Sequence, residues 1–240
     1  LRATRESDII VVAVPANETS DVIREIIPAL RKNTLLFDLS AIKAPVVQAL
    51  RLAEKHGADV ASLHPMFGPR ASGVKGRTII IVQAGRNRAG TTMVRKLFKG
   101  ADIVVTDART HDKRMALCLA LPHFINMAFA GILTRGARLA RLRKFAGRTF
   151  TLQLLLSQVI ASEPDTTADI QTMNRSARET LRDLQREIQT LVKTVERGNR
   201  SELIARYRRI RTLMSADPQF KVSGKAYEEA CKAVLAITRP

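Results

Sequence analysis

The sequence contains no tryptophan and only two cysteines among its 240 residues. Cys118 and Cys231 stand far apart in segments of helical pattern, without the spacing of a disulfide framework or a zinc site. No basic-then-apolar signal segment opens the chain, and we expect no apolar run of the roughly 18–20 residues that span a membrane. We therefore expect a cytoplasmic protein with reduced thiols, no metal site and no membrane partner.

Acidic residues are scarce relative to basic ones. Forty Lys and Arg face 22 Asp and Glu, which gives a formal net charge of +18. Residues 70–100 hold eight basic side chains and no acidic one. Such a field attracts polyanions, so RNA is an alternative partner. No aromatic residues interleave the basic clusters as stacking platforms, which favours ordinary solvated basic faces.

A glycine-rich turn is also missing. None of the twelve glycines forms a G-x-G, although a free-standing dinucleotide-binding domain normally opens with strand, G-x-G-x-x-G turn and helix. Two explanations stay open: the chain is a fragment without the first βαβαβ half, or it has lost dinucleotide binding. We favour the fragment.

Predicted strands and helices alternate along the chain up to about residue 108. Five short β-branched runs read as strands, and helical spacing of apolar residues separates several of them. This alternation predicts βαβ units in a partial doubly wound parallel sheet. The first run, "SDIIVVAVP", is continuous enough to predict a strand buried on both faces. The five runs are 7–15, 34–40, 58–64, 77–85 and 101–107.

From about residue 110 the pattern is helical to the end of the chain. A long apolar segment follows, in which Pro122 is expected to kink the helix. The fold class is therefore α/β followed by all-α. We expect one domain over residues 1–108 and a helical domain over residues 109–240.

His64 occupies the most suggestive position in the sequence. It ends the third predicted strand and begins the loop "HPMFGPRASG". Ligands of open parallel sheets bind at this carboxyl end of the strands. Imidazole is suited to removing a proton near neutral pH, although a histidine at a strand end is often structural.

Several motifs occur together in a recognisable order. "DIIVVAVP", "DLSAIK", "HPMFGP", "THDKRMA" and "ALPHFINMAFA" follow one another along the chain. In order and spacing they resemble the prephenate and arogenate dehydrogenases of tyrosine biosynthesis. The resemblance covers nearly the whole chain, from the later strands of a Rossmann-like domain into a helical dimerisation domain.

The resemblance implies a dehydrogenase that uses NAD or NADP to decarboxylate prephenate or arogenate oxidatively. His64 would be the catalytic base that accepts the ring hydroxyl proton, and His123 would contact the substrate from the other wall. The "HD" pair at 111–112 would be structural and cap its helix. Cofactor contacts are expected at Pro15, Asn17 and Ser40. The resemblance also implies a homodimer through the helical domain.

Two residues depart from the family pattern. The serine that helps to hold the substrate hydroxyl falls on Ala41, with Ser40 as its neighbour. The arginine that clamps a substrate carboxylate falls on Gln158, which lacks the charge for a bidentate pair. The missing charge could come from three basic residues: Arg70, Lys43 or Arg148.

Two functions of other classes stay as alternatives. One is a catalytically retired dehydrogenase whose basic surface binds RNA, for instance at a ribosome, with an affinity that falls as salt rises. The other is a helical dimerisation module that only scaffolds partners.

Overall fold

The computed structural model describes residues 1–68, 71–135 and 139–238. The chain divides into two compact units. The first unit comprises Leu1–Pro122 and Glu163–Thr180, and the second comprises His123–Ser162 and Leu181–Pro240. The boundary near residue 108 suggested by the sequence stays a prediction.

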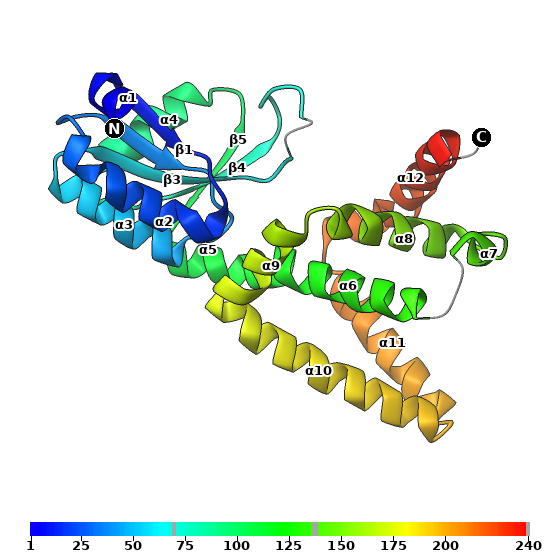
Figure 1. Ribbon diagram of the computed structural model, residues 1–240. Helices are drawn as coiled ribbons and strands as arrows, with labels where there is room; N and C mark the ends of the chain where they lie inside the picture. The colour runs from blue at the N-terminus through cyan, green and yellow to red at the C-terminus, as the bar shows by residue number, and fades with distance from the viewer. Residues whose placement is uncertain (69–70, 136–138, 239–240) are drawn as a thin grey trace. The chain divides into compact units, whose positions relative to one another are not determined.

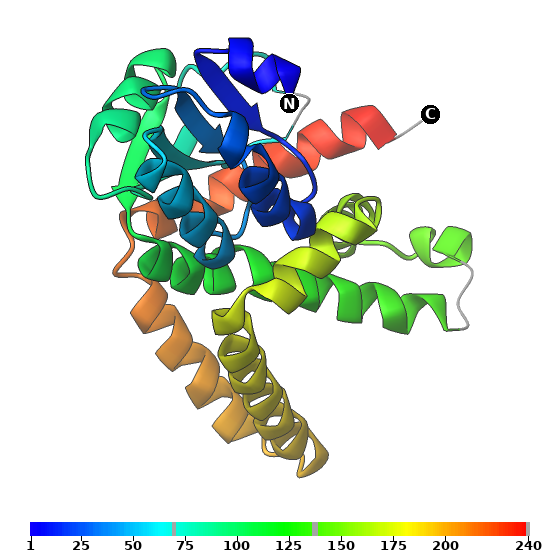
Figure 2. The ribbon, with the colours of Figure 1, turned by 60° about the vertical axis from the view of Figure 1, so that its left-hand side comes forward.

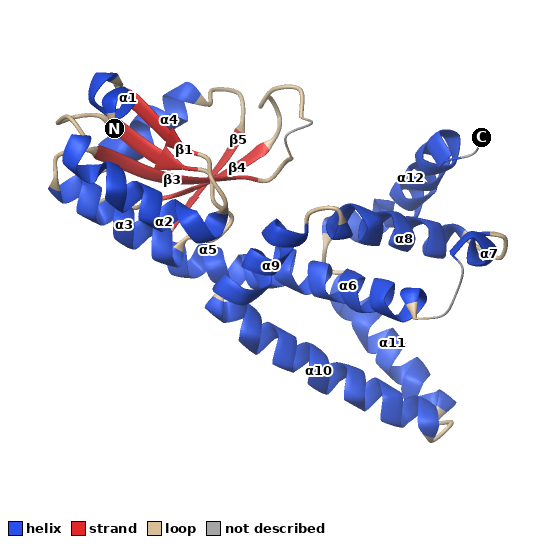
Figure 3. Cartoon of the chain, in the orientation of Figure 1, coloured by secondary structure: helices blue, strands red, loops and turns tan. Residues whose placement is uncertain are grey.

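The first unit is built on a five-stranded sheet whose order follows the chain, β1-β2-β3-β4-β5. Every strand of the described residues lies before residue 107, and Figure 3 shows these strands together in one sheet. The α/β class and all five predicted strands are confirmed. The strands are β1 (Ile9–Val12), β2 (Leu35–Asp38), β3 (Asp59–Pro65), β4 (Thr78–Val82) and β5 (Asp102–Thr106).

One strand departs from the expected parallel arrangement. β4 runs antiparallel to β3, whereas the other neighbouring pairs are parallel. The described residues between β3 and β4 form no helix. An antiparallel neighbour needs no helical crossover, so this connection can remain a loop. The sheet is therefore mixed.

Helices cover both faces of the sheet. α2 (Ala16–Ile26) and α3 (Ala44–Lys55) lie side by side on one face, as Figures 1 and 2 show. α4 (Ala89–Leu97) packs on the other face. Successive residues of a strand point to opposite faces, so Leu36 joins the α2–α3 core and Leu35 joins the α4 core. Short helical elements also occur at α1 (Arg2–Glu6) and a 3₁₀ turn (Ile27–Ala29).

The expectation that the first strand is buried on both faces is wrong. Ile9 is 45% exposed and Val11 is 46% exposed in β1. β1 lies at an edge of the sheet and pairs only with β2 among the described strands. A continuous β-branched run reports strand propensity, but the number of covered faces depends on packing that the run does not encode.

Helices form the rest of the chain. α5 (Ala108–Met115) leads through a π-helical turn (Ala116–Ala120) into α6 (Leu121–Thr134). The wider turn immediately precedes Pro122, where the sequence predicted a disturbance, because proline cannot donate to a regular helical ladder. The remaining elements are α7 (Leu139–Arg143), α8 (Arg148–Ala161), α9 (Pro164–Met173), α10 (Arg175–Glu196), α11 (Arg200–Met214), a 3₁₀ turn (Pro218–Val222) and α12 (Ser223–Thr238).

The expectation that no segment reaches membrane-spanning length is wrong. The helical segment Ala108–Thr134 is 27 residues long, has a mean hydropathy of 1.8 in its most apolar window, and is long and apolar enough to cross a bilayer. Length and composition alone are weak evidence, because a core helix of a globular protein passes the same test.

In the second unit, polar contacts join helices that are distant in sequence. Asn126 of α6 accepts hydrogen bonds from Gln153 and Ser157 of α8, at 3.0 and 2.9 Å. The hydroxyls of Thr149 and Tyr227 connect α8 with α12 at 3.1 Å. These contacts hold α6, α8 and α12 together within the unit.

Candidate active site

The carboxyl ends of β1, β2 and β3 lie beside one another because these strands are parallel and in register. β3 extends beyond β2 and carries His64 next to its last residue. His64 is only 7% exposed. The fold therefore places the histidine where open α/β sheets bind ligands, as its sequence position suggested.

A cavity of about 700 Å³ opens at this end of the sheet. Its volume falls within the range of small-molecule sites. The wall is mainly apolar, and the described lining residues include no Lys or Arg. They are Val14, Pro15, Ala16, Leu39, Ser40, Ala41, His64, Pro65, Phe67, Gly68, Asp165, Thr166, Asp169 and Ile170.

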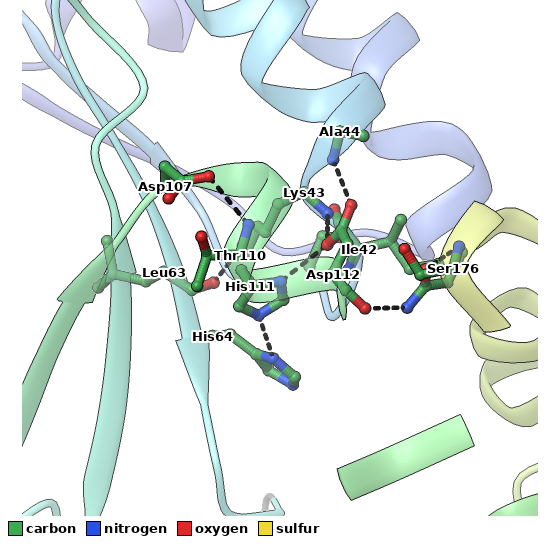
Figure 4. A network of polar contacts seen from close by, with 12 residues as sticks. Ile42, Lys43, Ala44, Leu63, His64, Asp107, Thr110, His111, Asp112 and Ser176 are labelled. Atoms are coloured by element: carbon green, nitrogen blue, oxygen red, sulfur yellow. Dashed lines mark hydrogen bonds and ion pairs between the residues drawn. The ribbon is translucent and has the colours of Figure 1, made fainter. Parts of the chain in front are cut away.

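His64 is hydrogen-bonded to a second histidine. Its Nδ1 lies 3.0 Å from Nε2 of His111, and Nδ1 of His111 lies 2.8 Å from Oδ1 of Asp112. Figure 4 shows the three side chains in a line, with Nε2 of His64 on the side away from His111. His111 is only 1% exposed, so surrounding atoms fix its ring.

Asp112 also holds the beginning of α3. Its Oδ1 accepts from the backbone N–H of Lys43 at 3.1 Å, and its Oδ2 accepts from that of Ala44 at 3.0 Å. Two N–H groups at a helix N-terminus are thereby satisfied, and the helix dipole favours a negative charge there. Asp107, and not the "HD" pair, caps α5 by accepting from the Thr110 N–H. The expectation that this pair caps its own helix is wrong.

Lys43 is fully buried. Its Nζ donates to Oδ2 of Asp38 at 2.9 Å and to the carbonyl of Leu63 at 2.6 Å. Burial lowers the pKa of Lys43, while Asp38 and Asp112 act in the opposite direction. The side chain does not line the cavity, so the idea that Lys43 contacts a substrate carboxylate is corrected: its ammonium neutralises Asp38 in the core.

The surroundings of His64 disfavour a positive charge. Burial lowers the pKa of His64 from 6.5 to about 3, and Coulomb repulsion from Lys43, and from His111 whenever that ring is protonated, acts in the same direction. The ring is therefore neutral at physiological pH, so one of its nitrogens carries a lone pair.

Ser40 and Ala41 both line the cavity and lie in the loop after β2. The hydroxyl of Ser40 is within 3.2 Å of both the backbone nitrogen and the carbonyl of Ile42. It therefore stabilises the turn that leads into α3. The chain has left the strand at this point, so Ser40 and Ala41 are not forced to opposite faces as neighbouring strand residues are.

Among the expected cofactor residues, Pro15 lines the cavity and Asn17 lies just beyond it. The backbone N–H of Asn17, in the first turn of α2, donates to Oδ2 of Asp169 at 3.2 Å. Asp169 belongs to α9, and it lines the same cavity. Sequence reasoning missed this residue because the contact joins positions 152 residues apart.

The other expected substrate residues are distributed differently. His123 is half-buried and Gln158 is exposed, and both belong to the second unit. Gln158 lines a smaller cavity of that unit, about 280 Å³, together with Arg143. Arg148 pairs with Glu228. Arg70 lies outside the described residues.

Two sequence models of known families match the chain. The model described as "Prephenate dehydrogenase, nucleotide-binding domain" matches residues 1–79. The model described as "Prephenate dehydrogenase, dimerization domain" matches residues 107–209. The two matches cover most of the chain and fall on the α/β part and the helical part.

Curated relatives agree with these matches. A probable arogenate/prephenate dehydrogenase of Methanocaldococcus jannaschii is 30% identical over 207 residues, which are 82% of this chain and 46% of that protein. The T-protein of Haemophilus influenzae is 28% identical, over 85% of this chain and 55% of its own length. A 4-amino-4-deoxyprephenate dehydrogenase of Streptomyces pristinaespiralis is 27% identical, over 88% and 72%. The chain spans about half the length of the first two proteins.

Solved structures show the same fold. The prephenate dehydrogenase of A. aeolicus, in complex with hydroxyphenyl propionate and NAD+, gives a TM-score of 0.71 at 18% identity, over 88% of this chain and 77% of that one. Synechocystis arogenate dehydrogenase gives 0.69 at 16% identity, over 92% and 81%.

Proposed function

The chain belongs to the prephenate dehydrogenase family, and from this premise we propose that it acts in the NAD- or NADP-dependent oxidative decarboxylation of prephenate or arogenate. The products would be 4-hydroxyphenylpyruvate or tyrosine. The observation that carries the proposal is His64, a buried and neutral imidazole at the wall of the cavity.

His64 is the general base in this proposal. Its ring accepts the proton of the substrate's ring hydroxyl as the ring carbon loses a hydride, and the oxygen gains carbonyl character. A positioned base of this kind contributes about 10²–10⁴-fold to the rate. Loss of carbon dioxide then makes the ring aromatic, which renders the step effectively irreversible.

The cavity has features that suit a nicotinamide cofactor, which supplies the hydride acceptor when it is bound. Val14, Pro15 and Leu39 give it an apolar wall at the ends of β1 and β2, against which a flat ring can stack. The sequence holds no G-x-G turn, so we assign no residue of this chain to the pyrophosphate. Ser40 and Asn17 stay as proposed neighbours of the cofactor.

The residues proposed to bind the substrate carboxylates are identified by their positions in the family motifs. His123 and Gln158 are proposed contacts from the helical part, by position in the family motifs. Gln158 is neutral, so a cation must act from another position if the carboxylate is to be paired. Arg148 and Arg70 stay as candidates for that charge.

We also propose a homodimer formed through the helical part, in a cytoplasmic protein. In α10, Ile188, Val192 and Val195 are 47%, 46% and 63% exposed. Their spacing places them on one stripe of the helix. An exposed apolar stripe commonly marks a protein interface. Light scattering from the purified protein should give twice the mass of one chain.

The decisive experiment measures reduction of NAD and NADP by the purified protein with prephenate and with arogenate. His64→Ala should lower kcat by about 10²–10⁴-fold with the fold intact. His56→Ala is the matched control, since His56 is an exposed residue at the end of α3. Wild-type turnover in His64→Ala would falsify the assigned base. The comparisons give no support to RNA binding as the function.

A further inference from the structure

Asp112, His111 and His64 form a directed chain of hydrogen bonds. An ionised carboxylate only accepts, so Nδ1 of His111 donates its proton to Oδ1 of Asp112. In a neutral His111 the other nitrogen, Nε2, then carries a lone pair. The partner of that lone pair is Nδ1 of His64 at 3.0 Å, which must therefore be the protonated nitrogen of His64.

We propose that His111 and Asp112 are positioning residues that hold His64 in the tautomer with a bare Nε2 and then take up the proton that Nε2 receives. The proposal rests on the proposed function for its substrate. The first half concerns the resting protein and the second half concerns turnover, so each half has its own observable.

The proposed relay moves two protons. The substrate hydroxyl releases its proton to Nε2 of His64, and the Nδ1 proton of His64 moves to Nε2 of His111. His64 returns to a neutral ring, now protonated on Nε2, and His111 becomes an imidazolium. The chain of three residues thereby gains one proton from the substrate, and the reverse shift later releases one proton from Nε2 of His64.

The surroundings favour the charge on His111 over His64. Both rings are buried, so their neighbouring charges make the difference, and His64 has Lys43 as a positive neighbour. His111 lies 2.8 Å from a carboxylate. A positive charge in direct contact with a carboxylate is favoured by Coulomb attraction, which is strong where water is excluded. The proton therefore moves toward the negative end of the chain.

The geometry of the chain is set before any substrate binds. Asp112 accepts from two backbone N–H groups of α3 as well as from His111, so its carboxylate cannot rotate freely. Its own carbonyl accepts from Nδ2 of Asn174 at 2.8 Å. Removing partners that orient a histidine at a metal centre costs about 10–100-fold, and we expect a loss of the same order here.

The test begins with the resting protein, because the chain has only four histidines. Two-bond ¹H–¹⁵N spectra of the purified 240-residue chain distinguish protonated from bare ring nitrogens, and single His variants assign each ring. We expect His64 to carry its proton on Nδ1 alone. A proton on Nε2 of His64, or a mixture of tautomers, would overturn the proposal.

Two variants at one position separate the two halves. His111→Phe removes the acceptor, so His64 should populate both tautomers. His111→Gln keeps a carbonyl that can accept from Nδ1 but cannot take a proton, so the single tautomer should survive. Both should lower kcat about 10–100-fold with KM within about twofold. His56→Phe is the control and should change neither quantity.

The outcomes separate this inference from the proposed function. Wild-type kcat in both variants would overturn proton uptake by His111, and an unchanged single tautomer in His111→Phe would overturn its role in setting the tautomer. If His111→Phe fails to fold, His111→Gln still reports on proton uptake through kcat and its pH profile. The spectrum needs no turnover, so an inactive wild-type protein with the expected tautomer counts against the proposed function alone.

Discussion

The Nζ atom of Lys43 lies 2.9 Å from Oδ2 of Asp38, and both side chains are fully buried. The same ammonium donates to the carbonyl of Leu63, the residue before His64. The pair therefore does more than neutralise two core charges. It ties the loop after β2 to the strand that carries the proposed base.

Breaking this pair should strongly destabilise the first unit. Lys43→Met leaves the Asp38 carboxylate buried without its counter-charge, which costs about 3–5 kcal/mol in comparable cases. Arg31→Met is the matched control, since its partner Asp8 is 93% exposed and such pairs contribute about 0–1 kcal/mol. Urea unfolding of the two variants measures the difference. Equal losses would contradict the role assigned to burial.

The strands were predictable because their residues are β-branched and their neighbours are turn formers. The direction of β4 could not be predicted, because the sequence of residues 66–77 is compatible with either a parallel or an antiparallel next strand. The exposure of Ile9 and Val11 was equally hidden, because propensity does not report which faces are covered.

Part of the candidate site was likewise predictable from the sequence, and part was not. The place of His64 at the end of a strand was predictable, and a cavity lies beside it, while its role as a base stays a prediction. The contact of Asp112 with Ala44 joins positions 68 residues apart, and no local pattern announces it. The role of Lys43 was misjudged for the same reason: a lysine in a loop motif is usually exposed, and only the packing shows its burial.

The low pKa of His64 predicts a pH dependence of stability. Its pKa is about 3 in the folded protein and ordinarily 6.5, so between these values the unfolded chain binds a proton that the folded chain does not. The free energy of unfolding should therefore fall as pH drops below 6.5, by about 1 kcal/mol per pH unit from this group.

Urea unfolding at pH 7 and pH 5 measures that dependence. His64→Phe lacks the titrating ring, so its stability should fall less over this interval than that of the wild type. Restricting the comparison to this interval limits the contribution of carboxylates. Parallel profiles for the two proteins would show that His64 titrates normally in the folded state.

Restoring the missing serine should raise turnover. Ala41 lines the cavity and stands where the family motif has a hydroxyl for the substrate. Ala41→Ser should add one neutral hydrogen bond, about 0.5–1.5 kcal/mol, or roughly 2–10-fold in kcat/KM. Ser40→Ala is the comparison: it removes the bond of that hydroxyl to Ile42 and should lower stability, and a loss of turnover would report its proposed contact with the cofactor. If Ala41→Ser does not raise kcat/KM, Ser40 already donates the hydrogen bond to the substrate hydroxyl.

A charge at position 158 should strengthen substrate binding. Gln158→Arg restores the guanidinium of the family motif, and a charge-assisted pair with a carboxylate contributes about 1.5–3 kcal/mol, roughly 10–150-fold in kcat/KM. Gln185→Arg adds the same charge to an exposed position of α10. If kcat/KM rises equally in both variants, the increase comes from general attraction of an anionic substrate to a basic protein and not from a specific ion pair.

Because α4 packs closely on β3, replacing glycine by alanine should have opposite effects on stability at Gly90 and at Gly131. A Cβ added to Gly90 would lie 2.7 Å from the backbone nitrogen of Val60 and closer still to its carbonyl oxygen. Backbone atoms of a central strand cannot move aside, so Gly90→Ala must shift the helix. Overpacking of this kind costs about 1–3 kcal/mol. That cost exceeds the gain of about 1 kcal/mol that alanine brings to a helix.

Gly131→Ala isolates the propensity effect. Gly131 lies inside α6, and apart from its chain neighbours and the adjacent backbone of its own helix, no atom of the described residues lies within 4 Å of its added Cβ. The substitution should stabilise the protein by up to about 1 kcal/mol, because alanine has less backbone entropy to lose than glycine. Val60 lies only four residues before His64, so Gly90→Ala should also lower kcat, whereas Gly131→Ala should not lower it through this strand. A Gly90→Ala protein as stable and active as the wild type would mean that α4 can retreat from β3 without disturbing the strand that positions the base.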